Sequence, residues 1–358
     1  MGHGQGTVWR ASNQRGLPMA QSENYVYASG SPWKLGGLKK REPARQTRGS
    51  KPVRHGAGGQ DRRPSVYEPV FLRAGMLLRE RRNARRPGSI GCAAPLQPAT
   101  MKPIREASQE SNMSIDSFDD LAGMEHAGKV TRAVIDAMKA EVQPGVTTQE
   151  LDEVGAAVIR RHRARSAPQM VYGFPGHNCI SVNDESVHGI PGSRKLVHGD
   201  LVKLDVTVEL NGYMADACET VPVGSADAAG HRLIDCASRA FAAGLTAARP
   251  GARAFDIGRE IYRTVRAAGY SVVRGLYGHG IGKTIHELPT IPNEFDPRCS
   301  EVLTEGLVFT IEPMIAAGDS RTVTLKDGWT VRTRDRSRSA HYEHTIVLLQ
   351  DGPRLLTA

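Results

Sequence analysis

The chain has 358 residues, of which 39% are hydrophobic, so it is long enough to bury a sizeable core. The net charge of +9 is uneven, because residues 1–112 hold 20 Lys or Arg against 7 Asp or Glu, whereas residues 113–358 hold 27 against 31. The larger part is mildly acidic and therefore gives no sign of nucleic-acid binding. No apolar run approaches the roughly 18 to 20 residues that a membrane span needs. The cysteines show no paired spacing, so no disulfide framework is expected.

Residues 1–112 are rich in Gly, Pro, Ser, Gln and Arg and show no sustained apolar periodicity, which predicts a disordered basic extension. Three explanations compete: a targeting segment, a basic tail that contacts RNA or ribosomes, and upstream sequence translated from a start codon assigned too early. We favour the last, because Met113 stands immediately before the first well-patterned segment. The protein is then expected to be cytoplasmic, and organellar if the extension is a transit peptide.

Four helices are predicted in the remainder. Apolar residues at helical spacing run from Ser117 to Met138 and stop before Pro144-Gly145, and a second helix has Thr148 as its candidate N-cap. Two more are expected around residues 232–248 and 255–268. Strand-like runs lie at Cys179–Val182, Leu201–Leu210, Tyr213–Val223, Val308–Ile311 and Tyr342–Leu349. This arrangement predicts an α+β fold, in which an antiparallel sheet carries helices on one face.

The run Leu201–Leu210 alternates strictly between apolar and polar residues, and Asn211-Gly212 then gives a strong hairpin signal. The register that follows pairs Leu210 with Tyr213, Thr207 with Asp216 and Asp205 with Cys218. Asp205 and Asp216 would then be diagonal neighbours roughly 7 to 8 Å apart, near enough to converge on two ions. The alternative is two solvated acids on the polar face of a hairpin.

Further acids and histidines favour the metal interpretation. His279 lies in a glycine-rich segment followed by His286, whereas Glu312 ends one apolar strand and Glu343 interrupts another. A buried, unpaired carboxylate is costly. The two glutamates and the two aspartates make four carboxylates, whose negative charges would repel one another unless protons or cations compensate them. An oxygen-rich set with one imidazole suits Mn, Fe, Co or Zn. Two such divalent ions would neutralise the cluster.

These motifs, in their order and spacing, resemble type I methionine aminopeptidases, which have the pita-bread fold. The resemblance covers about residues 113–358. The motifs that carry it are Ser181-Val182-Asn183-Asp184, His188-Gly189-Ile190-Pro191, Asp205-Val206-Thr207-Val208 with Asp216, Gly278-His279-Gly280-Ile281-Gly282, His286-Glu287, Phe309-Thr310-Ile311-Glu312-Pro313-Met314 and Tyr342-Glu343-His344-Thr345-Ile346. The implied activity is removal of the initiator methionine from nascent proteins whose second residue is small.

The resemblance also implies the roles of the metal-site residues. Asp216 and Glu343 would bridge two divalent ions, Asp205 would complete one ion's site, and His279 with Glu312 would complete the other's. Water activated by the ions would attack the carbonyl after the first residue. Glu312 would also act as the proton shuttle.

A second group of residues would bind the substrate. The residues matching the cleft histidines are His188 and His286, which would bind the peptide and stabilise the tetrahedral intermediate. Phe174, Cys179 and Trp329 match positions that shape the methionine pocket, although a core role is the alternative for Phe174. His286 is not expected to bind metal.

Some positions depart from the family's pattern. Val171-Tyr172 replaces the usual Tyr-His, and Ile285 stands where an aromatic residue is common. Both changes lie on the side of the methionine pocket. They leave the metal chemistry intact but put the tightness of selection for methionine in doubt. No catalytic role is expected for the other histidines, because an unsupported histidine is more often a surface or core hydrogen-bonding residue. These are His126, His162, His177, His198, His231, His341 and His344.

Two other functions remain open. One is a proline-specific aminopeptidase of the same fold, but such enzymes usually carry a folded N-terminal domain that residues 1–112 do not predict. The other is a catalytically dead pita-bread binding module for RNA or protein, yet such relatives lose metal ligands and this chain keeps all five. We expect a monomer that recognises the N-terminal methionine of nascent polypeptides, with no specific nucleic-acid partner.

Overall fold

The computed structural model describes residues 117–358, so the predicted disordered extension over residues 1–112 lies outside the described part of the chain. Four long helices and one short helix occur within it. They are α2 (Phe118–Ala140), α3 (Thr148–Arg161), α4 (Ala167–Tyr172), α5 (Ala228–Ala247) and α6 (Ala254–Ala267). The four predicted helices are thus confirmed, and none in residues 117–358 is long and apolar enough to cross a membrane.

The helix starts follow from capping side chains. Ser117 caps α2 by accepting a hydrogen bond from the backbone N–H of Asp120 at 3.1 Å. Helix α3 is capped by Thr147 and not by Thr148 as predicted, because Thr147 and Glu150 form a reciprocal capping box. Helix α5 begins at Ala228, earlier than expected, since Asp227 supplies its cap.

The strands are mostly antiparallel neighbours in one large sheet. Its main path has the order β1-β4-β5-β13-β9-β7-β8. Their bounds are β1 (Arg165–Ser166), β2 (Cys179–Val182), β3 (Glu185–Val187), β4 (Leu201–Leu210), β5 (Tyr213–Pro222), β6 (Ser271–Val272), β7 (Gly278–Gly280), β8 (Glu287–Ile291), β9 (Val308–Ile311), β10 (Met314–Ala316), β11 (Thr322–Thr324), β12 (Val331–Thr333), β13 (Ser339–Leu349) and β14 (Gly352–Leu355). The predicted α+β fold with an antiparallel sheet is confirmed.

The predicted hairpin between β4 and β5 is confirmed residue by residue. Thr207 lies opposite Asp216, and Asp205 lies opposite Cys218. Asn211 and Gly212 form the turn with φ angles of 53° and 92°, as a two-residue hairpin with both central residues at positive φ requires.

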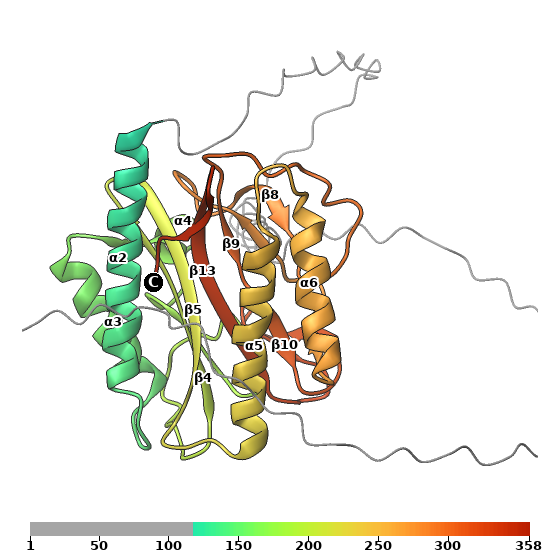
Figure 1. The fold of residues 1–358 in the computed structure, drawn as a ribbon. Helices are drawn as coiled ribbons and strands as arrows, with labels where there is room; N and C mark the ends of the chain where they lie inside the picture. The colour runs from blue at the N-terminus through green and yellow to red at the C-terminus, as the bar shows by residue number, and fades with distance from the viewer. Residues whose placement is uncertain (1–116) are drawn as a thin grey trace, which may run out of the picture. The chain divides into compact units, whose positions relative to one another are not determined.

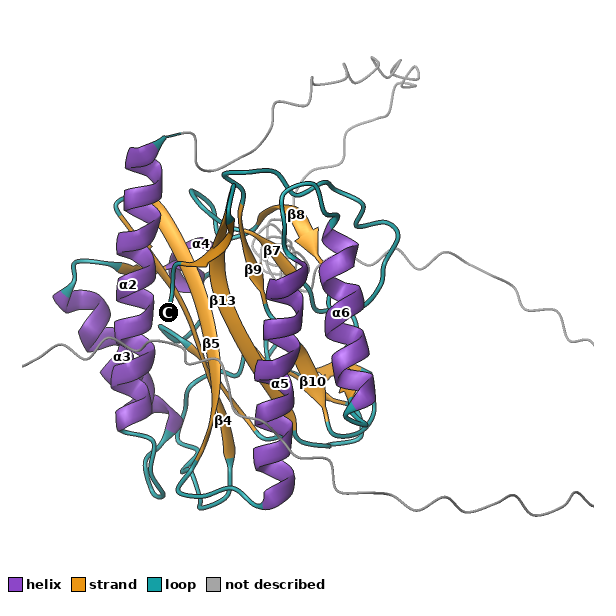
Figure 2. Ribbon diagram, viewed as in Figure 1, coloured by secondary structure: helices purple, strands orange, loops and turns teal. Residues whose placement is uncertain are grey.

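Helices α2, α3, α5 and α6 lie over one face of the sheet (Figure 1, Figure 2). In the first pair α2 contacts β4 and β5 and α3 packs on α2, and in the second pair α5 contacts β13, β9 and β10 and α6 contacts β6 and β8. The apolar residues of β4 pack against the first pair, and those of β9 and β13 pack against the second. The polar side chains of β4 on the opposite face are buried or half-buried. That face is therefore not solvated, and it carries the cavity described next.

Candidate metal centre and substrate cavity

Five neighbouring strands each place one predicted ligand on the same region of the sheet. Asp205 lies on β4, Asp216 on β5, Glu343 on β13 and His279 on β7, and Glu312 directly follows β9. These strands are adjacent in the order β4-β5-β13-β9-β7. Residues that are as far apart as positions 205 and 343 in sequence are thereby brought together.

These side chains line a cavity of about 780 Å³. Eight of the residues predicted for the site lie on its wall. They are Cys179, His188, Asp205, Asp216, His279, His286, Glu312 and Glu343. The departures Tyr172 and Ile285 line it as well.

The strand register explains how the acids converge. Cys218 lies opposite both Asp205 and Glu343, so these three residues form one row across β4, β5 and β13 and project from the same face. Asp216, two residues before Cys218, shares that face. Its backbone is held to β13 by Thr345, whose hydroxyl accepts the N–H of Asp216 and donates to its carbonyl, both at 2.8 Å.

His279 presents the nitrogen that a metal ion needs. Its Nδ1 lies 2.9 Å from the carbonyl oxygen of Gly280, which can only accept, so the proton of the neutral ring is on Nδ1. The lone pair is therefore on Nε2, which faces Glu312 Oε1 at 3.6 Å. The Thr310 hydroxyl donates to that same Glu312 oxygen at 2.7 Å and orients the carboxylate.

Burial and mutual repulsion disfavour the charged forms of the four acids. Burial raises the pKa of Asp205, Glu312 and Glu343 well above their ordinary values, and negative charge on neighbouring acids raises it further. Burial also raises the pKa of Asp216 to about 7, against the opposing hydrogen bonds from Thr207 and the Ala217 backbone. Protons or cations must therefore compensate the negative charge of these four carboxylates.

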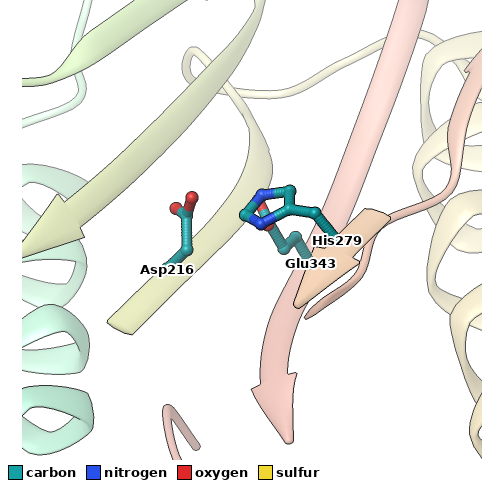
Figure 3. A group of neighbouring side chains, drawn as sticks. All are labelled: Asp216, His279 and Glu343. Carbon is teal, nitrogen blue, oxygen red and sulfur yellow. The ribbon is translucent and has the colours of Figure 1, made fainter. Parts of the chain in front are cut away.

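The donor atoms fit divalent metal ions. Asp216, His279 and Glu343 each offer one donor atom, and these atoms lie within 4.8 Å of one another (Figure 3). A second set of the same kind consists of Glu312, His341 and Glu343. The buried Oδ1 atom of Asp216 has no hydrogen-bond partner in residues 117–358, which is consistent with a ligand atom. Asp205 joins neither set, although it lines the cavity.

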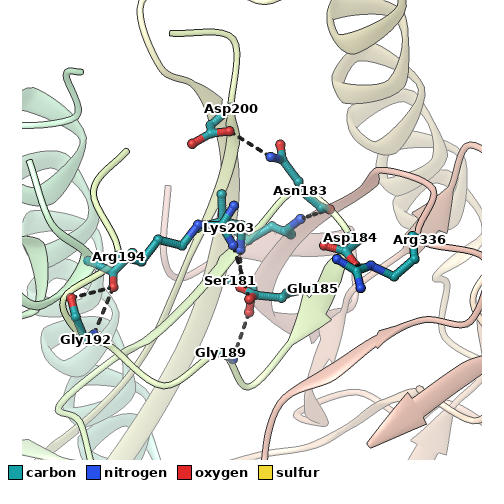
Figure 4. A network of polar contacts seen from close by, with 12 residues as sticks. Ser181, Asn183, Asp184, Glu185, Gly189, Gly192, Arg194, Asp200, Lys203 and Arg336 are labelled. Atoms are coloured by element: carbon teal, nitrogen blue, oxygen red, sulfur yellow. Dashed lines mark hydrogen bonds and ion pairs between the residues drawn. The ribbon is translucent and has the colours of Figure 1, made fainter. Parts of the chain in front are cut away.

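His188 is positioned by a polar network around the segment that carries it. Its φ angle of 57° is unusual for a residue other than glycine, and such conformations persist only where the surroundings hold them. Beneath this segment the buried Lys203 ammonium donates to the carbonyl of Asn183 at 2.8 Å and to that of Ser339 at 3.0 Å (Figure 4). The Ser181 hydroxyl accepts the N–H of Gly189 at 2.9 Å.

The network gives the Ser181–Asp184 motif a structural role. It ties the turn between β2 and β3 to the start of β13, so His188 keeps a fixed place on the cavity wall. Burial lowers the pKa of His188 to about 4. The ring is therefore neutral at neutral pH and can serve as a hydrogen-bonding group.

His286 lies against the other end of the metal cluster. Its ring centroid is 4.1 Å from that of His279, and its Nδ1 atom lies 2.6 Å from the hydroxyl oxygen of Tyr172. Burial, followed by the neighbouring His279 and His188, lowers the pKa of His286 to about 2. Tyr172 ends α4 and was not predicted as a partner of His286.

The three residues predicted for the methionine pocket pack together, but only one of them lies on the cavity wall. Cys179 lines the cavity, whereas Phe174 and Trp329 are buried behind it and are not part of the cavity wall. The two rings pack edge to face with centroids 5.3 Å apart. Phe174 thus has the core position that was the alternative for it.

The sequence reasoning missed the place of one residue on the cavity wall and the role of another. His341 lines the cavity although no role was expected for it, and Tyr172, noted only as a departure from the family pattern, contacts His286. For Tyr172 the available signal was its departure from the family pattern. For His341 it was the strand alternation, which puts residue 341 on the same face as Glu343.

Comparison with known proteins agrees with this geometry. The model of metallopeptidase family M24 matches residues 122–350. Methionine aminopeptidase 2 of Bacillus subtilis is 40% identical over 247 residues, which are 68% of this chain and 99% of that protein. A methionine aminopeptidase of Clostridium perfringens is 43% identical over 234 residues, 65% of this chain and 94% of that protein.

A solved structure shows the same fold. The methionine aminopeptidase from Rickettsia prowazekii superposes with a TM-score of 0.67 at 40% identity. The match covers 69% of this chain and 100% of that one.

Proposed function

Because the chain belongs to metallopeptidase family M24, we propose that it is an aminopeptidase that removes the initiator methionine from proteins whose second residue is small. The observation that carries this proposal is the cavity in which four buried carboxylates and His279 converge. The relatives that match over nearly their whole length are methionine aminopeptidases, which favours this function over proline-specific cleavage.

The metal-site residues are Asp205, Asp216, His279, Glu312 and Glu343, and together they would hold two divalent ions drawn from Mn, Fe, Co or Zn. Bound ions supply Lewis acidity, lower the pKa of water towards about 7 and polarise the peptide carbonyl. The Nε2 lone pair of His279 and the unpartnered Oδ1 of Asp216 support this assignment.

Proton transfer and peptide binding are the roles of the next group of side chains. Glu312 has a raised pKa and a fixed carboxylate, so it suits a group that takes up a proton and passes it to the leaving amine. The neutral rings of His188 and His286 would bind the peptide and stabilise negative charge on its carbonyl oxygen. Cys179, backed by Phe174 and Trp329, would contact the methionine side chain.

The decisive assay measures methionine release from a Met-Ala-Ser peptide. The full chain is stripped of metal and then given Mn, Co, Fe or Zn, and we expect release only after metal is restored. Asp216→Asn removes one proposed ligand and should lower the rate by at least about a hundredfold. Asp235→Asn changes an exposed aspartate on α5 and is the matched control. No release with any of the metals would contradict the proposal.

Selectivity is a separate prediction. We expect Met-Ala and Met-Gly peptides to be cleaved faster than Leu- or Phe-led peptides, because the buried Cys179 keeps its part of the cavity wall apolar. The measurement is kcat/KM for each peptide at a fixed metal concentration. Equal values for the Leu- or Phe-led peptides would refute selection for methionine while leaving the aminopeptidase activity in place.

A further inference from the structure

His341 lies on β13 two residues before Glu343, so both side chains project from the same face of the strand. The His341 side chain is 2% exposed and lines the cavity. Its Nε2 atom is 3.4 Å from Oε2 of Glu343 and 3.9 Å from Oε2 of Glu312. The ring therefore faces the two glutamates.

Neither ring nitrogen of His341 makes a hydrogen bond to any residue in the described part of the chain. A buried polar atom without a partner costs about 1 to 3 kcal/mol, and native proteins seldom leave both nitrogens of an imidazole in that state. A partner for this ring is therefore missing from the protein alone. With an ion bound at Nε2, only the Nδ1 atom of His341 would be without a partner.

The distances fit an ion better than a direct hydrogen bond. Good N–H···O hydrogen bonds measure about 2.7 to 3.2 Å, and both Nε2 distances are longer. Atoms that bind one ion through bonds of about 2.0 to 2.2 Å lie roughly 3 to 4 Å apart. The donor atoms of Glu312, His341 and Glu343 lie within 4.8 Å of one another.

We propose that His341 is a sixth metal-binding side chain, which binds through Nε2 the ion that Glu312 and Glu343 hold. The centre then contains two imidazoles, His279 and His341, in place of one. A second imidazole shifts the preference of the site towards Zn, Co and Fe and away from Mn, which favours oxygen ligands. This inference rests on metal binding by the proposed centre and not on peptide cleavage, so the two can fail separately.

The first test uses the unmodified full chain labelled with ¹⁵N-histidine. NMR of the imidazole nitrogens is recorded before and after zinc is added, and the signals are assigned with His279→Gln and His341→Gln. We expect two rings to become metal-bound through Nε2. Binding by His279 alone, or a proton that stays on Nε2 of His341 in the zinc-loaded chain, would overturn the proposal.

The second test measures ion affinities by calorimetry. His341→Gln should weaken the zinc affinity of one of the two sites by at least about tenfold and weaken manganese binding less. His198→Gln, which changes an exposed histidine beside Ser225, is the matched control. Unchanged zinc affinity at both sites would overturn the proposal, and a variant that fails to fold leaves the NMR result on the unmodified chain to decide.

A peptide assay on the same samples separates the two proposals. If His341 binds zinc and no metal supports methionine release, the proposed function is wrong and this inference stands. If methionine is released and the His341 ring stays unbound, only this inference is wrong.

Discussion

Tyr172 controls how His286 faces the cavity. Burial raises the pKa of Tyr172 to about 12, so its hydroxyl keeps its proton at neutral pH and can donate it to Nδ1 of His286. The proton of the neutral ring is then on Nε2, where it can be donated to a substrate carbonyl. Donation by the Tyr172 hydroxyl thus favours the tautomer of His286 that carries its proton on Nε2.

Tyr172→Phe removes that hydrogen bond and keeps the ring. A net hydrogen bond contributes about 1 kcal/mol, so we expect kcat/KM for Met-Ala-Ser to fall about fivefold while zinc affinity stays the same. The matched control is Tyr262→Phe, at an exposed tyrosine on α6. An unchanged kcat/KM would show that the hydroxyl does not orient His286.

At the scale of single residues, the sequence predicted eight of the residues that line the cavity. Asp205 and Asp216 were predicted from strand alternation and the turn between them. Glu312 and Glu343 were predicted as acids that end or interrupt apolar strands, and His279 from its glycine-rich segment. Tyr172 could not be found in this way, because its partner His286 is 114 positions away and only the folded chain brings the two together. His341 differs in this respect, because it lies two residues before Glu343 on β13 and strand alternation alone places the two side chains on one face.

At the scale of the elements, Glu219 on β5 joins the sheet to α2. Its carboxylate lies 3.2 Å from Nη2 of Arg132 and 2.6 Å from Nζ of Lys139. Burial alone would raise the pKa of Glu219, but these two cations lower it below its usual value of 4.5. The stability from this contact is therefore present above pH 4.5 and is lost as the pH falls through the lowered pKa.

Glu219→Gln should reduce the free energy of unfolding by about 1 to 2 kcal/mol at pH 7. The loss should be smaller at a second, acidic pH below the lowered pKa of Glu219, where the wild-type carboxylate is protonated. Denaturant melts at both pH values measure the difference. Glu260→Gln, which breaks an exposed ion pair with Arg263 on α6, should have little effect. An equal loss at both pH values would contradict the electrostatic explanation.

Long elements were predictable, and short ones were not. Strands β2, β4 and β9 have the predicted bounds, because runs of four to ten residues carry a readable pattern of apolar side chains. Strands such as β6 and β7 contain two or three residues, which is too few to show a period. Their place depends on neighbouring strands, so only the assembled sheet defines them.

At the scale of the whole molecule, the folded state of the metal-free chain is less stable at neutral pH than at acidic pH, as far as the pKa of Asp216 decides it. Because the pKa of Asp216 rises from 3.8 to about 7 on folding, the stability that its protonated form provides is fully present below pH 3.8 and is lost as the pH rises through about 7. Metal ions bind the deprotonated ligands, so they should restore stability most strongly at the higher pH.

We therefore expect the metal-free chain to have a higher Tm at pH 5 than at pH 7.5. A metal concentration about a hundredfold above Kd should add about 2.7 kcal/mol to the free energy of unfolding. Thermal melts with EDTA and with excess Mn²⁺ at both pH values test this. Asp216→Asn should reduce the pH difference in EDTA, and an identical pH dependence in this variant would exclude Asp216 as its source.

The order of the strands has a consequence for the synthesis of the protein. In the large sheet β13 lies between β5 and β9, yet it is made after both of them. Before residue 339 leaves the ribosome, Asp205 and Asp216 belong to one half of the sheet, and His279 and Glu312 belong to the other. The strand with Glu343 then joins the halves, so a growing chain cannot assemble the complete proposed metal centre until its last long strand has been translated.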